Sequence, residues 1–106
     1  MMKRGEIWWA KLEQPVGRRP VLLLSRDEAY TVRSLVIVSP ITTRVRRIPT
    51  EVVLGSKEGM PQDCVVNLDT IITIPKDSLE SHLTTLSSRK LKEVEAALRF
   101  SLGFGQ

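Results

Sequence analysis

The chain has 106 residues, 42% of them apolar, and 16 basic residues against 12 acidic ones give a net charge of +4. This length predicts one domain, residues 1–106, and the positive charge is typical of proteins that bind polyanions. The single Cys64 excludes an internal disulfide, and no segment approaches the roughly 20 apolar residues of a membrane helix. We therefore expect a soluble, cytoplasmic protein.

Strands are predicted over the first three quarters of the chain. The run Val21 to Leu24 is aliphatic without alternation, which predicts a strand buried on both faces. A helical turn at residues 76–79 and a short strand at 82–86 are more weakly indicated. The predicted strands cover residues 6–12, 21–24, 34–39, 50–54 and 64–74.

The last part of the chain predicts a helix. Ser87 is the expected N-cap, and Gly103 follows the expected end. Strands followed by one helix favour an α+β, mainly β domain, in which the helix covers an antiparallel barrel-like sheet, OB-like or SH3-like. Apolar residues recur at helical spacing, at Leu91, Val94, Leu98 and Leu102.

Few residues can support metal or cofactor chemistry. Zinc sites need several histidine or cysteine ligands, and the chain has only His82 and Cys64. The sequence has no Walker loop, Rossmann glycine pattern or nucleophile elbow. No metal or cofactor is assigned, and His82 is interpreted as a surface or packing residue.

Two groups of arginines are the main candidates for binding an anion. Arg18 and Arg19 precede the predicted buried strand, which would hold them rigidly. Arg44, Arg46 and Arg47 lie in "SPITTRVRRIPTEVVL"; if this stretch is extended, the first two share a face and Arg47 lies opposite. The alternatives are a solvated loop for the second group and, for Arg19, a surface ion pair with Asp27 or Glu28.

The order of several motifs resembles one known family. They are "RGEIWWAKL", "RRPVLLLSRD", "SPITT", "RIPTEVVL", "DCVVNLDTIITI" and "LSSRKLKEVEAALRFSLGF", and together they span nearly the whole chain. This ordered set resembles the MazF/PemK-like toxins of toxin–antitoxin systems. The resemblance implies an SH3-like barrel that acts as a homodimer and is neutralised by a cognate acidic antitoxin.

The resemblance also implies an activity. The implied toxin is a metal-independent endoribonuclease that cleaves single-stranded mRNA at selected sequences. Attack by the ribose 2′-hydroxyl leaves 2′,3′-cyclic phosphate and 5′-hydroxyl ends. Arg19 and Thr50 match the catalytic arginine and threonine of the family, and Asp69 matches an acidic residue proposed as the base in some relatives.

The residue chemistry fits these implied roles. Arg19 presents a rigid, planar set of donors to a phosphate, and because its guanidinium is already protonated it cannot serve as the base. Thr50 can donate its hydroxyl to the phosphate or orient the ribose. The other arginines are expected to follow the RNA backbone: Arg18, Arg44, Arg46 and Arg47.

The chain also departs from the family. Its first loop is only "EQPVG", shorter than in many relatives, and Asn67 replaces an arginine found in some of them. Trp8 and Trp9 could stack on RNA bases, but strand tryptophans are more often core or interface anchors, and we interpret both as packing residues. Two other functions remain open: a non-catalytic SH3-like module that binds nucleic acid or protein, and a toxin that inhibits DNA gyrase.

Overall fold

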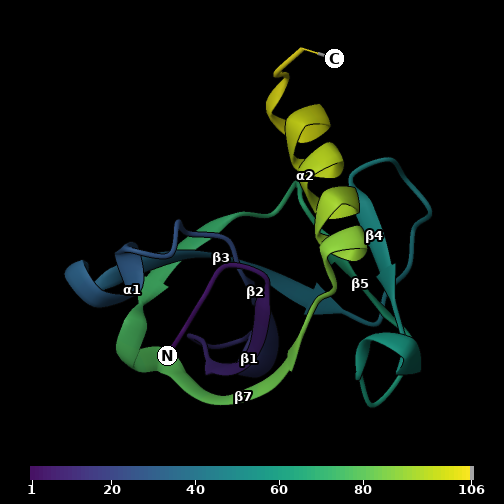
Figure 1. The fold of residues 1–106 in the computed structure, drawn as a ribbon. Helices are drawn as coiled ribbons and strands as arrows, with labels where there is room; N and C mark the ends of the chain where they lie inside the picture. Colours follow the sequence, from purple (N-terminus) through teal and green to yellow (C-terminus); the bar gives the residue numbers. More distant parts are fainter. Residues whose placement is uncertain (106) are drawn as a thin grey trace.

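The computed structural model describes residues 1–105 and has seven strands and a long C-terminal helix (Figure 1). The strands are β1 (Glu6–Lys11), β2 (Arg18–Leu23), β3 (Leu35–Thr42), β4 (Glu51–Leu54), β5 (Cys64–Asn67), β6 (Ile72–Pro75) and β7 (Leu79–Thr85). The helices are α1 (Ala29–Val32), the 3₁₀ turns η1 (Ser56–Glu58) and η2 (Lys76–Ser78), and α2 (Ser88–Leu102).

All strand pairs are antiparallel and form one curled sheet in the order β4-β5-β3-β2-β1-β7. The long strand β3 pairs with β2 along one edge, and along its other edge its first half pairs with β6 and its last residues pair with β5. This change of partner bends the sheet into a half-barrel, shown in Figure 1 with α2 beside β4 and β5. The predicted mainly β fold with a C-terminal helix is therefore confirmed.

Strand β2 is buried on both faces, as its sequence predicts. Val21, Leu22 and Leu23 have no exposed surface; Leu22 faces one hydrophobic cluster, and its two neighbours face another. Full burial of such a side chain stabilises the fold by about 1.5–3 kcal/mol. The strand is consequently a rigid base for the arginines at its start.

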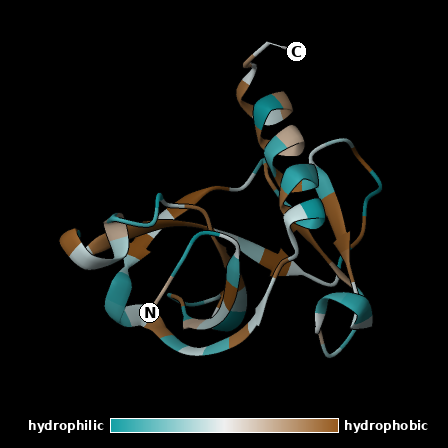
Figure 2. Cartoon of the chain, in the orientation of Figure 1, coloured by the Kyte–Doolittle hydropathy of each residue, from teal (hydrophilic) through white to brown (hydrophobic). Residues whose placement is uncertain are grey.

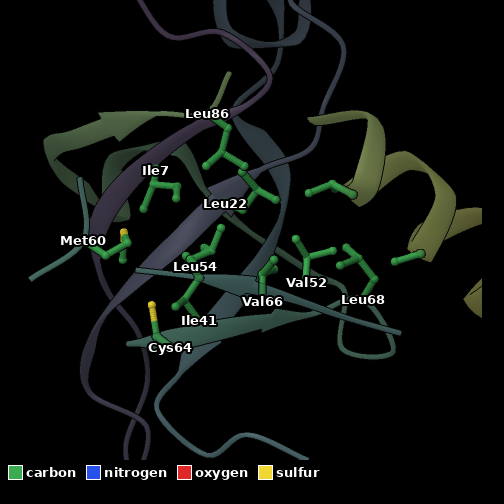
Figure 3. Close-up of a cluster of buried hydrophobic side chains, with 12 residues drawn as sticks. Ile7, Leu22, Ile41, Val52, Leu54, Met60, Cys64, Val66, Leu68 and Leu86 are labelled. Atoms are coloured by element: carbon green, nitrogen blue, oxygen red, sulfur yellow. The ribbon is translucent and has the colours of Figure 1, made fainter. Parts of the chain in front are cut away.

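Helix α2 covers the cluster that contains Leu22. Val94 and Ala97 are its buried residues, and Figure 3 shows Val52 and Leu68 of this cluster on the side facing the helix. The helix begins where the sequence predicts, because the Ser87 hydroxyl oxygen accepts the N–H of Lys90, and it ends at Gly103 in a left-handed conformation. Figure 2 shows hydrophobic segments in β3 and β4, and teal and brown residues mixed along the helix.

Several boundaries differ from the predictions. Strand β2 begins at Arg18, three residues before the aliphatic run, because Arg18 and Arg19 pair with Lys11 and Ala10 of β1. β3 extends to Thr42, and β7 begins at Leu79. The short helices α1 and η1 were not predicted, since each is at most four residues long and has no clear periodicity.

The strand predicted at residues 64–74 is in fact two strands. A turn separates β5 from β6, with the Thr70 N–H donated to the Asn67 carbonyl at 3.0 Å and the Asp69 N–H donated to Asn67 Oδ1 at 2.9 Å. An asparagine side chain that accepts a nearby backbone N–H competes with the sheet ladder and favours a turn. Asp69 therefore lies in a turn and not in a strand.

Helices long and apolar enough to cross a membrane are absent from residues 1–105.

Candidate active site

Arg19 lies on the wall of a hollow of about 140 Å³, which we call the Arg19 hollow. Its side chain is partly buried, and within residues 1–105 it makes no ion pair. The surface pairing with Asp27 or Glu28 is not formed, because Asp27 accepts the Arg4 N–H and Glu28 lies 3.9 Å from Arg26. The lining consists of Arg19, Pro40, Thr42, Arg44, Arg46, Glu51, Asn67 and Thr70.

Glu51 shapes the arginine loop that borders this hollow. Its Oε1 accepts the backbone N–H groups of both Arg46 and Arg47, each at 2.9 Å. Two successive N–H groups that converge on one oxygen require a tight turn, and Arg47 accordingly has a left-handed φ of 58°. The loop is curled and not extended, so strand alternation is not what places its arginines.

The curled loop still separates its arginines. Arg44 and Arg46 both line the Arg19 hollow, whereas Arg47 lines a different hollow together with Lys57 and Lys90. The Arg19 hollow is thus lined by three arginines, one from β2 and two from the loop. A guanidinium there keeps its charge at any working pH and can bind a phosphate by paired hydrogen bonds.

Thr50 and Asp69 form a second part of the site. The Thr50 hydroxyl donates to Asp69 Oδ2 at 2.9 Å, and the Leu68 N–H donates to the Thr50 carbonyl at 2.8 Å. Asp69 is exposed, and its Oδ1 accepts the Ser101 hydroxyl from α2 at 2.9 Å. A carboxylate has about four acceptor sites, so Asp69 can still take up a proton or accept further hydrogen bonds. Thr50 itself is only 4% exposed.

The turn that carries Asp69 is braced from below by β3. The Ser39 hydroxyl is fully buried, 2.8 Å from the carbonyl oxygen of Thr70 and 3.0 Å from that of Asn67. These contacts fix the turn against the sheet and satisfy backbone groups that burial would otherwise leave unpaired. Asn67 takes a structural part here, since its side chain accepts the Asp69 N–H.

The two parts of the site adjoin each other but do not merge. The Arg19 hollow is lined by Glu51, the residue after Thr50, and by Thr70, the residue after Asp69. Thr50 and Asp69 themselves do not line it. The predicted catalytic residues therefore lie as one arginine in a hollow and one hydrogen-bonded pair at its border.

Arg18 lies apart from the Arg19 hollow. Its guanidinium carbon is 4.3 Å from the centre of the Trp9 ring, and its Nε donates to Glu80 Oε1 at 2.8 Å. Arg18, Arg19 and Trp9 line a second hollow of about 250 Å³, which we call the Trp9 hollow. Arg18 is thus a paired, stacked cation and not a free one.

Trp8 and His82 are packing residues in this structure. The two rings meet edge to face with centres 5.8 Å apart, and Trp8 packs against the cluster that contains Val21. Cys64 is buried and free, and burial, together with the nearby Asp63 and Glu58 charges, raises the pKa of its thiol to about 11. Within residues 1–105, no three His, Cys, Asp or Glu side chains gather as metal ligands.

Three residues of the site were not predicted from the sequence. Glu51 clamps the arginine loop, Ser101 ties Asp69 to α2, and Trp9 supports Arg18. The acidic residue directly after "RRIPT" was a usable signal, because a carboxylate next to a basic loop often binds that loop. Ser101 gave none, since it lies 32 residues from Asp69 in the sequence.

Comparison with known proteins identifies close relatives over the whole chain. A family model described as "PemK-like, MazF-like toxin of type II toxin-antitoxin system" matches residues 3–102. "Probable endoribonuclease MazF2" of Mycobacterium tuberculosis is 40% identical over 103 residues, which cover 96% of this chain and 99% of that protein. "Endoribonuclease MazF" of Staphylococcus saprophyticus is 39% identical over 112 residues, covering 97% and 92%.

Solved structures share the fold. "Mycobacterium tuberculosis toxin MazF-mt6" matches with a TM-score of 0.87 and 31% identity, covering 95% of this chain and 99% of that one. A mycobacterial endoribonuclease solved in complex with its cognate antitoxin matches with a TM-score of 0.88 and 26% identity, covering 100% and 99%. The curled sheet and its helix are therefore the architecture of these toxins.

Proposed function

The chain belongs to the PemK-like, MazF-like toxins of type II toxin–antitoxin systems, and on this premise we propose that it is a metal-independent endoribonuclease acting on single-stranded mRNA. The observation that carries this proposal is the Arg19 guanidinium, which has no ion pair within residues 1–105, starts from a buried strand and lines a hollow shared with Arg44 and Arg46. Close relatives named as endoribonucleases support it. Arg19 binds the scissile phosphate, and the rest of the hollow holds the RNA backbone next to it.

Arg19 stabilises charge in the reaction. The ribose 2′-oxygen attacks the adjacent phosphorus, the bond from phosphorus to the 5′-oxygen breaks, and negative charge grows on the phosphate oxygens in between. A preorganised guanidinium at that phosphate lowers the barrier, because it needs no reorientation as the charge develops. The products are a 2′,3′-cyclic phosphate and a 5′-hydroxyl.

Asp69 accepts the proton of the 2′-hydroxyl, and Thr50 orients its carboxylate. This assignment is supported by the 2.9 Å hydrogen bond between them and by the exposure of Asp69 beside the hollow. The Ser101 contact from α2 holds the other carboxylate oxygen. The proton of the leaving 5′-oxygen comes from solvent, since a guanidinium is a poor proton donor at neutral pH.

The loop arginines guide the RNA backbone. Arg44 and Arg46 contact phosphates next to the scissile one, and Arg47 extends the basic surface toward Lys57 and Lys90. Arg18 contributes less charge than the sequence suggests, because Glu80 neutralises it. An acidic antitoxin segment would compete for the same surface by complementary charge.

The toxin acts as a homodimer in the cytoplasm, and this chain forms one toxin domain. Apolar side chains exposed around the end of α2 support self-association, since monomers rarely leave such residues grouped. They are Phe100, Leu102 and Phe104, which are 63%, 49% and 60% exposed. Light scattering after gel filtration measures the assembly directly and is expected to give twice the 12.0 kDa chain mass.

Incubation with mixed-sequence RNA in excess EDTA tests the activity. We expect discrete fragments with 2′,3′-cyclic phosphate ends from the wild-type protein and far fewer from Arg19→Ala prepared identically, which also controls for contaminating nucleases. RNA binding without cleavage would instead indicate the non-catalytic module. Inhibition of DNA supercoiling with no loss of RNA would indicate a gyrase inhibitor.

A further inference from the structure

Trp9 is not a core residue in this fold, although tryptophans in amino-terminal strands usually are. It is partly buried and belongs to neither of the two hydrophobic clusters, in contrast to Trp8. Its ring instead lines the Trp9 hollow, which it shares with Arg19. A large aromatic face is thereby presented beside the proposed phosphate-binding arginine.

Two contacts hold Arg18 over this ring. Its guanidinium lies 4.3 Å from the ring centre, and the ion pair with Glu80 fixes Nε at 2.8 Å. The Arg18 side chain is nevertheless 53% exposed. Guanidinium planes and aromatic rings are the two kinds of surface on which unpaired RNA bases stack.

The remaining lining of the hollow suits the edge of a planar, polar ligand. Thr42, Thr43 and Gln62 offer hydroxyl and amide groups, and Met60 adds an apolar wall. At about 250 Å³, the hollow lies below the range of about 300–1,000 Å³ that is usual for drug-sized ligands. Its size therefore fits a small planar group such as a single nucleobase.

We propose that the Trp9 hollow is a nucleobase subsite, in which the base next to the phosphate held by Arg19 stacks on the Trp9–Arg18 pair. This inference rests on the proposed nuclease function and adds to it a determinant of sequence choice. Arg19 borders both hollows, so a phosphate at Arg19 places its neighbouring nucleotide at Trp9. The pair sets the preferred base at one position beside the cut.

The cleavage test compares Trp9→Leu, which removes the aromatic face, with Trp9→Phe, which keeps one. The 5′ ends of fragments from mixed-sequence RNA are mapped, and kcat and KM are measured on an oligonucleotide with the mapped site. For Trp9→Leu we expect KM to rise about tenfold to a hundredfold with kcat nearly kept, and the preference at one flanking base to relax. Trp9→Phe is expected to keep the wild-type pattern.

A binding test that does not use Trp9→Leu tests the subsite even if that variant fails to fold. Wild-type fluorescence is titrated with a short random-sequence RNA pool that is 2′-O-methylated and so resists cleavage. We expect quenching in the wild type that is lost in Trp9→Phe, which retains only Trp8.

The outcomes separate the two proposals. An unchanged cleavage pattern and KM in folded Trp9→Leu, or equal quenching in Trp9→Phe, would overturn the subsite. If Trp9→Leu cleaved RNA normally but no longer bound the antitoxin, the subsite would also be overturned, because the Trp9 hollow would then be a protein-binding site. Quenching by the 2′-O-methylated pool, together with no cleavage of unmodified mixed-sequence RNA, would support the subsite and reject the nuclease.

Discussion

The start of β2 and the turn between β5 and β6 present their functional side chains in opposite ways. Within residues 1–105 the Arg19 side chain has no ion-pair partner and lines a hollow, whereas Thr50 and Asp69 are hydrogen-bonded to each other and, through Ser101, to α2. A side chain without partners is free to bind a ligand, and a bonded pair also stabilises the fold. Substitutions in the two regions should therefore separate reaction rate from stability.

Arg19→Ala is expected to have the largest effect. Loss of one preorganised donor to developing charge typically slows an enzyme by about 100- to 1,000-fold, and Arg19 has no ion pair within residues 1–105 to lose. We expect cleavage to fall by that factor while the urea midpoint stays at the wild-type value. Arg19→Lys keeps the charge but lacks the paired, planar donors of the guanidinium, so it should recover only part of the rate. A rate within threefold of wild type for Arg19→Ala would remove the contrast between the regions.

Thr50→Val should affect stability as well as rate. Valine keeps the shape but removes the hydroxyl, so Asp69 Oδ2 loses its donor and a buried polar site becomes apolar. We expect the free energy of unfolding to fall by about 1–3 kcal/mol, measured by urea denaturation. Thr50→Ser is the matched control and should restore most of the stability. An unchanged midpoint for Thr50→Val would show that the bond is not a structural one.

Arg44→Ala and Arg46→Ala should weaken RNA binding with little effect on kcat. Each removes one phosphate contact, so the slope of log affinity against log salt should decrease by about 0.7 for single-stranded RNA. Arg47→Ala should change the slope less, because Arg47 lies at a different hollow. Affinity measured at several salt concentrations tests this. Equal slopes for all three variants would show that lining the Arg19 hollow makes no difference to how these arginines bind RNA.

Ser101→Ala is expected to have the smallest effect. It removes one hydrogen bond between α2 and Asp69, which is worth about 0.5–1.5 kcal/mol. We expect a small loss of stability and a small loss of rate, since Thr50 still orients the carboxylate. Denaturation and cleavage are measured side by side. A rate loss as large as that of Arg19→Ala would place α2 inside the catalytic machinery.

Features governed by local chemistry could be predicted from the sequence. The aliphatic run before Leu24 predicts the buried strand, and Ser87 with Gly103 predicts both ends of α2, because burial preference and capping depend on neighbouring residues. The functional candidates Arg19, Thr50 and Asp69 came from motifs and a family resemblance. Their type and order are properties of the chain alone.

Contacts between distant residues were decided only by the tertiary structure. The bond between Asp69 and Ser101 spans 32 positions, and the pair of Arg18 and Glu80 spans 62, so no local pattern could indicate them. The same holds for Trp9: strand alternation places it on one face of β1, but only the pairing of β1 with β2 brings Arg18 onto its ring. Which arginine stays free and which is neutralised depends on these long-range contacts, because charge pairing requires proximity in space and not in sequence.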